Sequence, residues 1–263
     1  MSKVAEYLTD LFGMQGQVAV VIGGTGVLGG ALAEGIARAG AKVVVAGRSE
    51  ERGQQRVETI AAAGGEGVFL PVQAAERASV NELLQQTLSR YGQVDMLVNC
   101  AGTNSSAPYT EITDDDWQRV IDSQLTATHL GCQIFAPVMA KQSSGGAILN
   151  IGSVTSHLPL SRVFAYSAAK AAVVNLTQNV AREFATQKVR VNVLCPGFFP
   201  AEQNRKILDA TRVANIMRQT PMARFGEPEE LVGSALLLLA RKAGAFVTGE
   251  DLYVDGGFTA MRF

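Results

Sequence analysis

The chain has 263 residues, of which 47% are hydrophobic and only 18% are charged, whereas soluble chains average about 25% charged residues. Its 23 Lys and Arg residues nearly balance 24 Asp and Glu residues, and the pI is near 6.2. This balance argues against a nucleic-acid binder, which would be basic, and the apolar content argues against disorder. The shortage of charge indicates extra buried surface, either in a large core or in subunit contacts.

Neither a targeting segment nor a membrane span is evident in the sequence. The longest apolar runs, residues 18–22 and 236–240, are far shorter than the ~20 residues that cross a bilayer. The three cysteines, Cys100, Cys132 and Cys195, are widely separated and lack metal-ligand spacing. We therefore expect a cytoplasmic protein with reduced thiols and no metal site.

Seven short apolar segments alternate with longer segments whose apolar residues recur with the helical period. Nearly continuous apolar strands are typical of a parallel sheet covered by helices on both faces. Repeated β-α units predict a single α/β domain over residues 1–263 with a doubly wound, seven-stranded parallel sheet. The expected strands are 17–22, 42–46, 67–72, 94–98, 147–151, 189–194 and 251–254. The last helix is expected at 228–242, after a substrate loop at about 196–224.

A glycine-rich turn follows the first expected strand. Residues 17–31 read QVAVVIGGTGVLGGA, in which Gly24, Gly26 and Gly29 satisfy the spacing G-x-G-x-x-G. Glycines at these positions permit a tight turn and close approach of the backbone to a pyrophosphate, which the following helix N-terminus attracts. The turn lies inside the first β-α-β unit, so it predicts a dinucleotide-binding Rossmann fold.

The end of the second expected strand bears on the choice of cofactor. An acidic residue there would accept hydrogen bonds from the ribose 2′-hydroxyl of NAD, but the segment reads Gly47-Arg48-Ser49. Arg48 is suited to a 2′-phosphate instead. The sequence therefore favours NADP(H), with NAD(H) as the alternative.

A candidate catalytic set of three residues follows the fifth expected strand. Tyr166 and Lys170 are four residues apart in a helical stretch and share one face, and Ser153 precedes them. The pKa of a free phenol is about 10, and a neighbouring lysine cation favours the tyrosinate. With Ser153 hydrogen-bonding a substrate oxygen, the set predicts proton exchange with an alcohol or carbonyl while nicotinamide exchanges hydride.

Together with the glycine turn, this pattern resembles the short-chain dehydrogenase/reductase family over nearly the whole chain. The family triad corresponds to Ser153, Tyr166 and Lys170, with the tyrosine at the usual spacing of thirteen positions after the serine. Two more family motifs appear as Asn99-Cys100-Ala101-Gly102 and Pro196-Gly197. The resemblance implies that Tyr166 is the general acid/base, that Lys170 lowers its pKa and holds the nicotinamide ribose, and that Ser153 orients the carbonyl.

The resemblance also implies which residues contact the cofactor. They are Gly23, Thr25, Gly26, Leu28, Gly29, Arg48, Gln73, Asn99, Ala101, Gly102, Tyr166, Lys170, Pro196 and Gly197.

Several positions depart from the family pattern. In the glycine motif, Ile22 replaces the threonine, Val27 replaces the middle glycine, and Gly26 lies one place early. Gln73 stands where an aspartate usually contacts adenine, and Gln124 stands where the fourth catalytic residue, an asparagine, helps to hold a water near the lysine. Gln124 keeps the amide on a longer side chain, so we count it as catalytic and expect reduced or retuned turnover rather than lost activity.

Within the family, the chain is similar to bacterial sugar-acid reductases, both fructuronate/mannonate oxidoreductases and gluconate 5-dehydrogenase-like enzymes. The stretches that carry this resemblance are 196–205, 221–230, and 246–249 leading to 254–257. The expected substrate contacts are His157, Arg162, Phe198 and Arg205. Because arginine binds carboxylates through two parallel hydrogen bonds, we expect Arg205 or Arg162 to hold the acid group.

Two other functions remain open, a 3-oxoacyl thioester reductase and a nucleotide-binding regulatory protein with weakened catalysis.

The resemblance implies a homotetramer in which the apolar helices near 113–141 and 163–187 form one interface and the region from the last helix to the last strand forms another. The run Asp114-Asp115-Asp116 follows Thr113, so we expect a helix N-terminus there rather than a metal site. The expected partner is a small-molecule substrate, with neither nucleic acid nor membrane.

Overall fold

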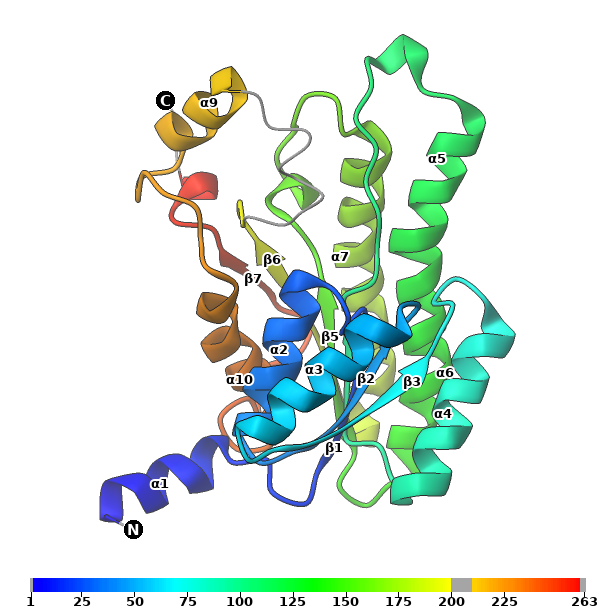
Figure 1. Cartoon of the computed structure of the whole chain (residues 1–263), viewed down its shortest axis with the longest axis vertical. Helices are drawn as coiled ribbons and strands as arrows, with labels where there is room; N and C mark the ends of the chain where they lie inside the picture. Colours follow the sequence, from blue (N-terminus) through cyan, green and yellow to red (C-terminus); the bar gives the residue numbers. More distant parts are fainter. Residues whose placement is uncertain (1, 200–209, 261–263) are drawn as a thin grey trace.

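The computed structural model describes residues 2–199 and 210–260, and its strands form one parallel sheet in the order β3-β2-β1-β4-β5-β6-β7 (Figure 1). Every neighbouring pair of strands is parallel, which confirms the doubly wound α/β fold expected from the sequence. The single-domain organisation over residues 1–263 stays a prediction. The strands are β1 (Val18–Ile22), β2 (Lys42–Gly47), β3 (Glu66–Pro71), β4 (Met96–Asn99), β5 (Gly146–Ile151), β6 (Val189–Pro196) and β7 (Asp251–Val254).

Helices cover both faces of the sheet, α2, α3 and α10 on one face and α4, α6 and α7 on the other (Figure 1). Alternate residues of β1 enter different cores, Ala19 and Val21 on the α2 side and Val20 and Ile22 on the α6 side. This two-sided burial is why the strands read as continuous apolar runs. The helices are α1 (Lys3–Phe12), α2 (Val27–Arg38), α3 (Glu50–Ala62), α4 (Arg77–Tyr91), α5 (Asp114–Ile121), α6 (Ala127–Lys141), α7 (Phe164–Phe184), α9 (Ala210–Gln219) and α10 (Val232–Leu239).

The chain differs from expectation mainly at element ends. The predicted helix 228–242 begins as a 3₁₀ turn, Pro228–Leu231, and its α-helical part ends at Leu239. The Arg190 guanidinium donates hydrogen bonds to the carbonyls of residues 238, 239 and 240 at the end of α10, and the Ala240 carbonyl also accepts one from the Gly244 amide. This long-range cap has no local sequence signal.

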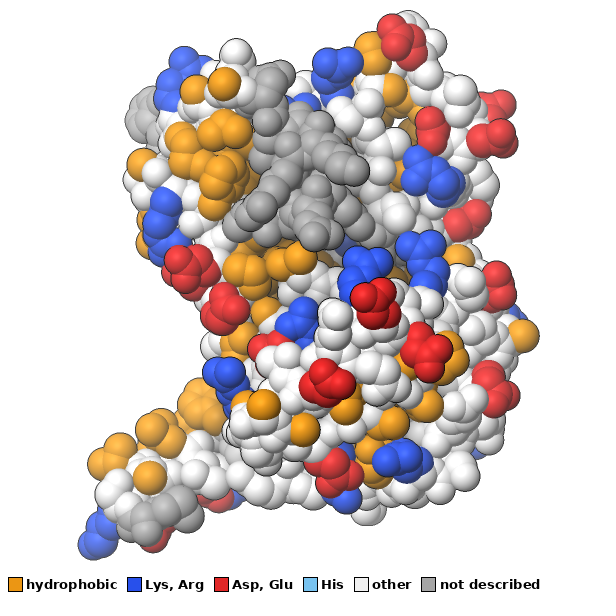
Figure 2. All heavy atoms as spheres, in the orientation of Figure 1, with side chains coloured by type: hydrophobic (Ala, Val, Ile, Leu, Met, Phe, Trp, Pro, Cys, Tyr) orange, Lys and Arg blue, Asp and Glu red, His pale blue; other side chains and the backbone are white. Residues whose placement is uncertain are grey.

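The N-terminal helix α1 was not expected from the sequence. Ser2 caps it by accepting a hydrogen bond from the Ala5 amide at 3.2 Å. No residue of α1 is buried, and Figure 2 shows the helix projecting from the body of the protein. None of the described helices is long and apolar enough to cross a membrane.

Helices α5 and α6 are joined by a single π-helical turn, Asp122–Thr126. Thr113 accepts a hydrogen bond from the Asp116 amide at 3.1 Å, which confirms the expected N-cap of α5. The π turn carries Gln124, and such bulges often occur at functional sites because they re-aim a side chain.

A buried amide network fixes α7 against the sheet. Asn150 on β5 is fully buried, and its side chain accepts a hydrogen bond from Asn99 of β4 at 2.8 Å and donates one to Thr177 of α7 at 2.9 Å. Buried polar groups of this kind hold elements in one arrangement because any movement leaves them without partners. The network therefore sets the position of the helix that carries Tyr166 and Lys170.

Candidate active site

The candidate site lies at the carboxyl ends of the strands, where the strand order reverses between β1 and β4. This crevice is the usual ligand site of open α/β sheets. Two adjoining cavities of about 290 and 220 Å³ occupy it. They share the residues Gly23, Gly26, Arg52, Cys100, Ala101, Gly102 and Thr103, and they therefore form one groove.

The glycine-rich turn forms the floor of this groove. Gly23 has φ +89°, and a Cβ there would lie 2.6 Å from the Ala101 amide nitrogen, so only glycine fits. A Cβ on Gly29 would lie 2.3 Å from the Gly23 carbonyl oxygen. The helix α2 begins after Gly26 without a side-chain cap, which leaves its first amides available to a phosphate. The turn thus fits a dinucleotide pyrophosphate, although Val27, the residue at the family's glycine position, also lines the groove.

Two arginines lie at the other end of the groove. Arg48 and Gln73 line the smaller cavity as expected, and Arg52 lines both cavities. Ser49 caps α3 by accepting a hydrogen bond from the Arg52 amide at 3.4 Å, so Arg52 sits in the first turn. No Asp or Glu is among the described residues that line the smaller cavity. Sequence reasoning missed Arg52, and the available signal was its position directly after the cap that follows Arg48.

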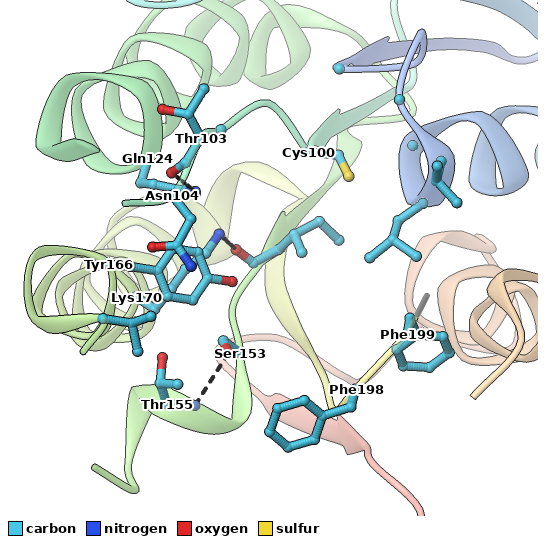
Figure 3. Close-up of a pocket in the computed structure, with 18 of the residues that line it drawn as sticks. Cys100, Thr103, Asn104, Gln124, Ser153, Thr155, Tyr166, Lys170, Phe198 and Phe199 are labelled. Atoms are coloured by element: carbon cyan, nitrogen blue, oxygen red, sulfur yellow. Dashed lines mark hydrogen bonds between the residues drawn. The ribbon is translucent and has the colours of Figure 1, made fainter. Parts of the chain in front are cut away.

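The three candidate catalytic residues line the larger cavity together (Figure 3). Ser153 follows β5, and its hydroxyl accepts a hydrogen bond from the Thr155 amide at 3.2 Å. Tyr166 and Lys170 lie on one face of α7, with the Lys170 ammonium 5.5 Å from the centre of the phenol ring. The same ammonium donates a hydrogen bond to the Ile151 carbonyl at 2.5 Å.

Burial dominates the electrostatics of these residues. It raises the pKa of Tyr166 to about 12, an effect that the hydrogen bond with Ser153 opposes. Burial also lowers the pKa of Lys170 to about 8. Desolvation of the tyrosinate is the largest of these effects, and the lowering of the Tyr166 pKa by Lys170 that the resemblance implies stays a prediction.

Two buried polar atoms at the larger cavity have no hydrogen-bond partner in the described part of the chain. The Gln124 amide donates a hydrogen bond to the Thr103 carbonyl at 2.8 Å, but its Oε1 accepts none. The hydroxyl of Thr155 is likewise without a partner. Buried polar groups are normally satisfied, so these two atoms indicate where a bound molecule or water would hydrogen-bond.

Most of the expected cofactor contacts line the groove, and two do not. The side chain of Asn99 points into the core network with Asn150, and Pro196 ends β6 outside the lining. The residues that do line it are Gly23, Thr25, Gly26, Leu28, Gly29, Arg48, Gln73, Ala101, Gly102, Tyr166, Lys170 and Gly197.

The expected substrate contacts are placed differently from one another. Phe198 lines the larger cavity, whereas His157 hydrogen-bonds Asp251 at 2.8 Å and does not line it. Arg162, with φ +66°, also lies outside the lining, and the roles of His157 and Arg162 as substrate contacts stay predictions. Arg205 lies outside the described residues.

A different arginine, Arg212 of α9, lines the larger cavity. This arginine falls within the substrate loop expected at about 196–224, but Arg205 is the substrate contact that was expected from that segment. No group of three His, Cys, Asp or Glu residues in the described ranges is arranged to hold a metal ion.

Lys170→Met removes a buried charge, so we expect it to raise the melting temperature at pH 7. The pKa of Lys170 is about 8 in the folded protein against an ordinary 10.5, so between these values the unfolded state binds more protons and wild-type stability rises with pH. The variant lacks this rise, and the difference between the proteins should shrink from pH 8 to 10.5.

Thermal melts across this range test the prediction, with the exposed Lys141→Met on α6 as the matched control, expected to show no such pH dependence. A Lys170→Met protein that is less stable than wild type at every pH would mean that the lost Ile151 hydrogen bond outweighs the relief of burial.

Comparisons with known proteins identify the family. The family model described as enoyl-(acyl carrier protein) reductase matches residues 25–259. The uncharacterized oxidoreductase UxuB of Bacillus subtilis is 37% identical, over 94% of this chain and 96% of its own. A 3-oxoacyl-[acyl-carrier-protein] reductase of Synechocystis is 36% identical, over 92% and 96%. The crystal structure of a gluconate 5-dehydrogenase from Burkholderia cenocepacia in complex with NADP and tartrate superimposes with a TM-score of 0.92 at 33% identity, over 97% and 99%. The chain belongs to the short-chain dehydrogenase/reductase family of oxidoreductases.

Proposed function

We propose that the protein interconverts a secondary alcohol and a ketone on a sugar acid, with NADP(H) as the hydride carrier. The observation that carries this proposal is the groove in which Ser153, Tyr166 and Lys170 adjoin the glycine-rich turn. The similarity to a gluconate 5-dehydrogenase that was crystallised with NADP and tartrate supports both the cofactor and the substrate class.

In this proposal, the chain's own residues donate and accept the proton that accompanies hydride transfer. When bound, the nicotinamide supplies or accepts the hydride. In the reductive direction, Ser153 donates a hydrogen bond to the carbonyl oxygen and Tyr166 donates its phenolic proton to the same oxygen. The Lys170 ammonium, 5.5 Å from the ring centre, then stabilises the tyrosinate that forms. In the oxidative direction, the tyrosinate removes the proton from the alcohol.

We propose that Gln124 tunes this proton transfer. Gln124 lines the cavity that also holds Lys170, and its buried Oε1 has no partner in the described residues, so this oxygen is suited to bind a water near the ammonium. The longer glutamine side chain places that water differently from an asparagine. Gln124→Asn is accordingly expected to alter kcat and its pH profile, and an unchanged profile would contradict this role.

A cofactor titration followed by a substrate panel tests the proposed function. Fluorescence titration with NADPH and NADH should show tighter binding of NADPH, and absorbance assays should show turnover of keto and hydroxy forms of sugar acids. The similarity to a 3-oxoacyl reductase favours one second candidate, so the panel includes a 3-oxoacyl thioester. Preference for the thioester, or cofactor binding without any turnover, would contradict the sugar-acid proposal.

Arg48 and Arg52 are proposed to bind the 2′-phosphate of NADP(H). Both line the smaller cavity, and no carboxylate among its described lining residues would repel the phosphate. Arg48→Gln and Arg52→Gln should each weaken NADPH binding by about tenfold or more, the usual value of a charge-assisted hydrogen bond, while NADH binding stays nearly constant. Arg38→Gln, on the exposed end of α2 and outside both cavities, is the control. Equal losses for NADPH and NADH would contradict the assignment.

We propose that the protein is a cytoplasmic homotetramer with neither nucleic-acid nor membrane partners. Exposed apolar side chains support the assembly because they lie in the two expected interface regions. Trp117 on α5 and Phe164 on α7 lie in the first region, and Leu237 on α10 and Phe246 after α10 lie in the second. Light scattering should give a mass of four times 27.8 kDa. A monomeric mass would contradict the tetramer.

A further inference from the structure

Arg212 occupies a distinctive place in the larger cavity. It belongs to α9, which lies above the carboxyl ends of β6 and β7 in Figure 1. It lines the same cavity as Tyr166 and Lys170, and it is partly buried. Its guanidinium donates a hydrogen bond to the Ser161 carbonyl at 3.1 Å, which ties α9 to the segment before α7.

The charges around this cavity divide into separate regions. Arg52, Lys170 and Arg212 are the cations among its described lining residues, and no Asp or Glu is among them. Arg52 also lines the smaller cavity, and Lys170 lies under the phenol ring, so both belong to the cofactor and proton-transfer end. Arg212 is therefore the cation of the remaining, substrate end.

The rest of that end is largely apolar. Leu160 and Val163 precede α7, and Phe198, Phe199 and Phe225 come from the segments after β6 and α9. Figure 3 shows Phe198 and Phe199 on the side of the cavity opposite α7. In apolar surroundings a guanidinium binds an anion more strongly than it would in water, because less solvent competes for it.

Thr155 supplies a second polar group beside the reacting position. Thr155 lines the cavity and is 5% exposed, its buried Oγ1 has no hydrogen-bond partner in the described chain, and its amide donates to the Ser153 hydroxyl. A buried hydroxyl left without a partner is costly unless a ligand satisfies it. A substrate hydroxyl next to the reacting carbon is the group that fits.

We infer that Arg212 binds the carboxylate of the substrate and that Thr155 binds a hydroxyl adjacent to the reacting carbon. This inference rests on the proposed function and narrows it to a small polyhydroxylated acid. The planar guanidinium suits a carboxylate through paired hydrogen bonds. A 3-oxoacyl thioester carries no free carboxylate, so the assignment also separates the two candidate functions.

The test compares each substrate acid with the neutral polyol that has a hydroxymethyl group in place of the carboxylate. Arg212→Gln should lower the preference of kcat/KM for the acid over the polyol by about 10- to 100-fold, mainly through KM. Arg212→Lys, which keeps the charge without the planar fork, should lose less. Arg218→Gln, on an exposed position of the same helix, is the control and should leave the preference unchanged.

Thr155→Val should lower kcat/KM for acid and polyol alike, because both carry the adjacent hydroxyl. A loss for the acid alone, or no loss for either, would overturn the role of Thr155. An acid preference that survives Arg212→Gln would overturn the role of Arg212.

Binding of tartrate to the enzyme–NADP⁺ complex, measured by calorimetry, separates this inference from the proposed function. Tartrate should bind about tenfold or more weakly to Arg212→Gln than to wild type. If the wild type turns over no sugar acid, the proposed function fails, and the calorimetry still decides whether Arg212 binds a hydroxy acid.

Discussion

The burial of the Lys170 ammonium at the edge of the sheet is the constraint on which the rest of the site depends. The ammonium reaches the Ile151 carbonyl at the end of β5, and its own backbone carbonyl accepts a hydrogen bond from Ser156 at 3.1 Å. Ser156 in turn accepts one from the Ser153 amide at 3.2 Å. One chain of hydrogen bonds thus ties the lysine of α7 to the turn that carries Ser153, and Tyr166 is held between them.

This arrangement holds the charge of the Lys170 ammonium in a buried place that solvent does not reach. Desolvation pulls the pKa of Lys170 down and pushes that of Tyr166 up, so the free protein holds a neutral phenol beside an ammonium. A neutral phenol is the form that gives a proton to a carbonyl oxygen. Burying the ammonium costs free energy, which the stability of the rest of the fold must offset. The amide network on β4, β5 and α7 fixes the helix that carries the ammonium in place.

The overall charge of the chain is near zero, so any attraction for anionic ligands must come from local groups. The structure gathers such groups at one edge of the sheet. Arg48 and Arg52 lie at one end of the groove, Lys170 lies beneath the middle and Arg212 lies at the other end, with no carboxylate among the described lining residues. The glycine turn adds the amides of α2 between them. The cations are spaced as separate contacts along an extended ligand, and they do not form a basic patch.

The sequence by itself determined the sheet, the glycine turn and the shared face of Tyr166 and Lys170, because these depend on the periods of apolar residues, on glycine spacing and on neighbours four residues apart. Only the tertiary structure decided that Arg52 and Arg212 line the same cavity, that His157 hydrogen-bonds Asp251, and that α10 ends at Leu239. It also decided the direction of the pKa shift at Tyr166. Each of these depends on distance and burial between segments far apart in the chain, and such contacts leave no period or spacing in the sequence.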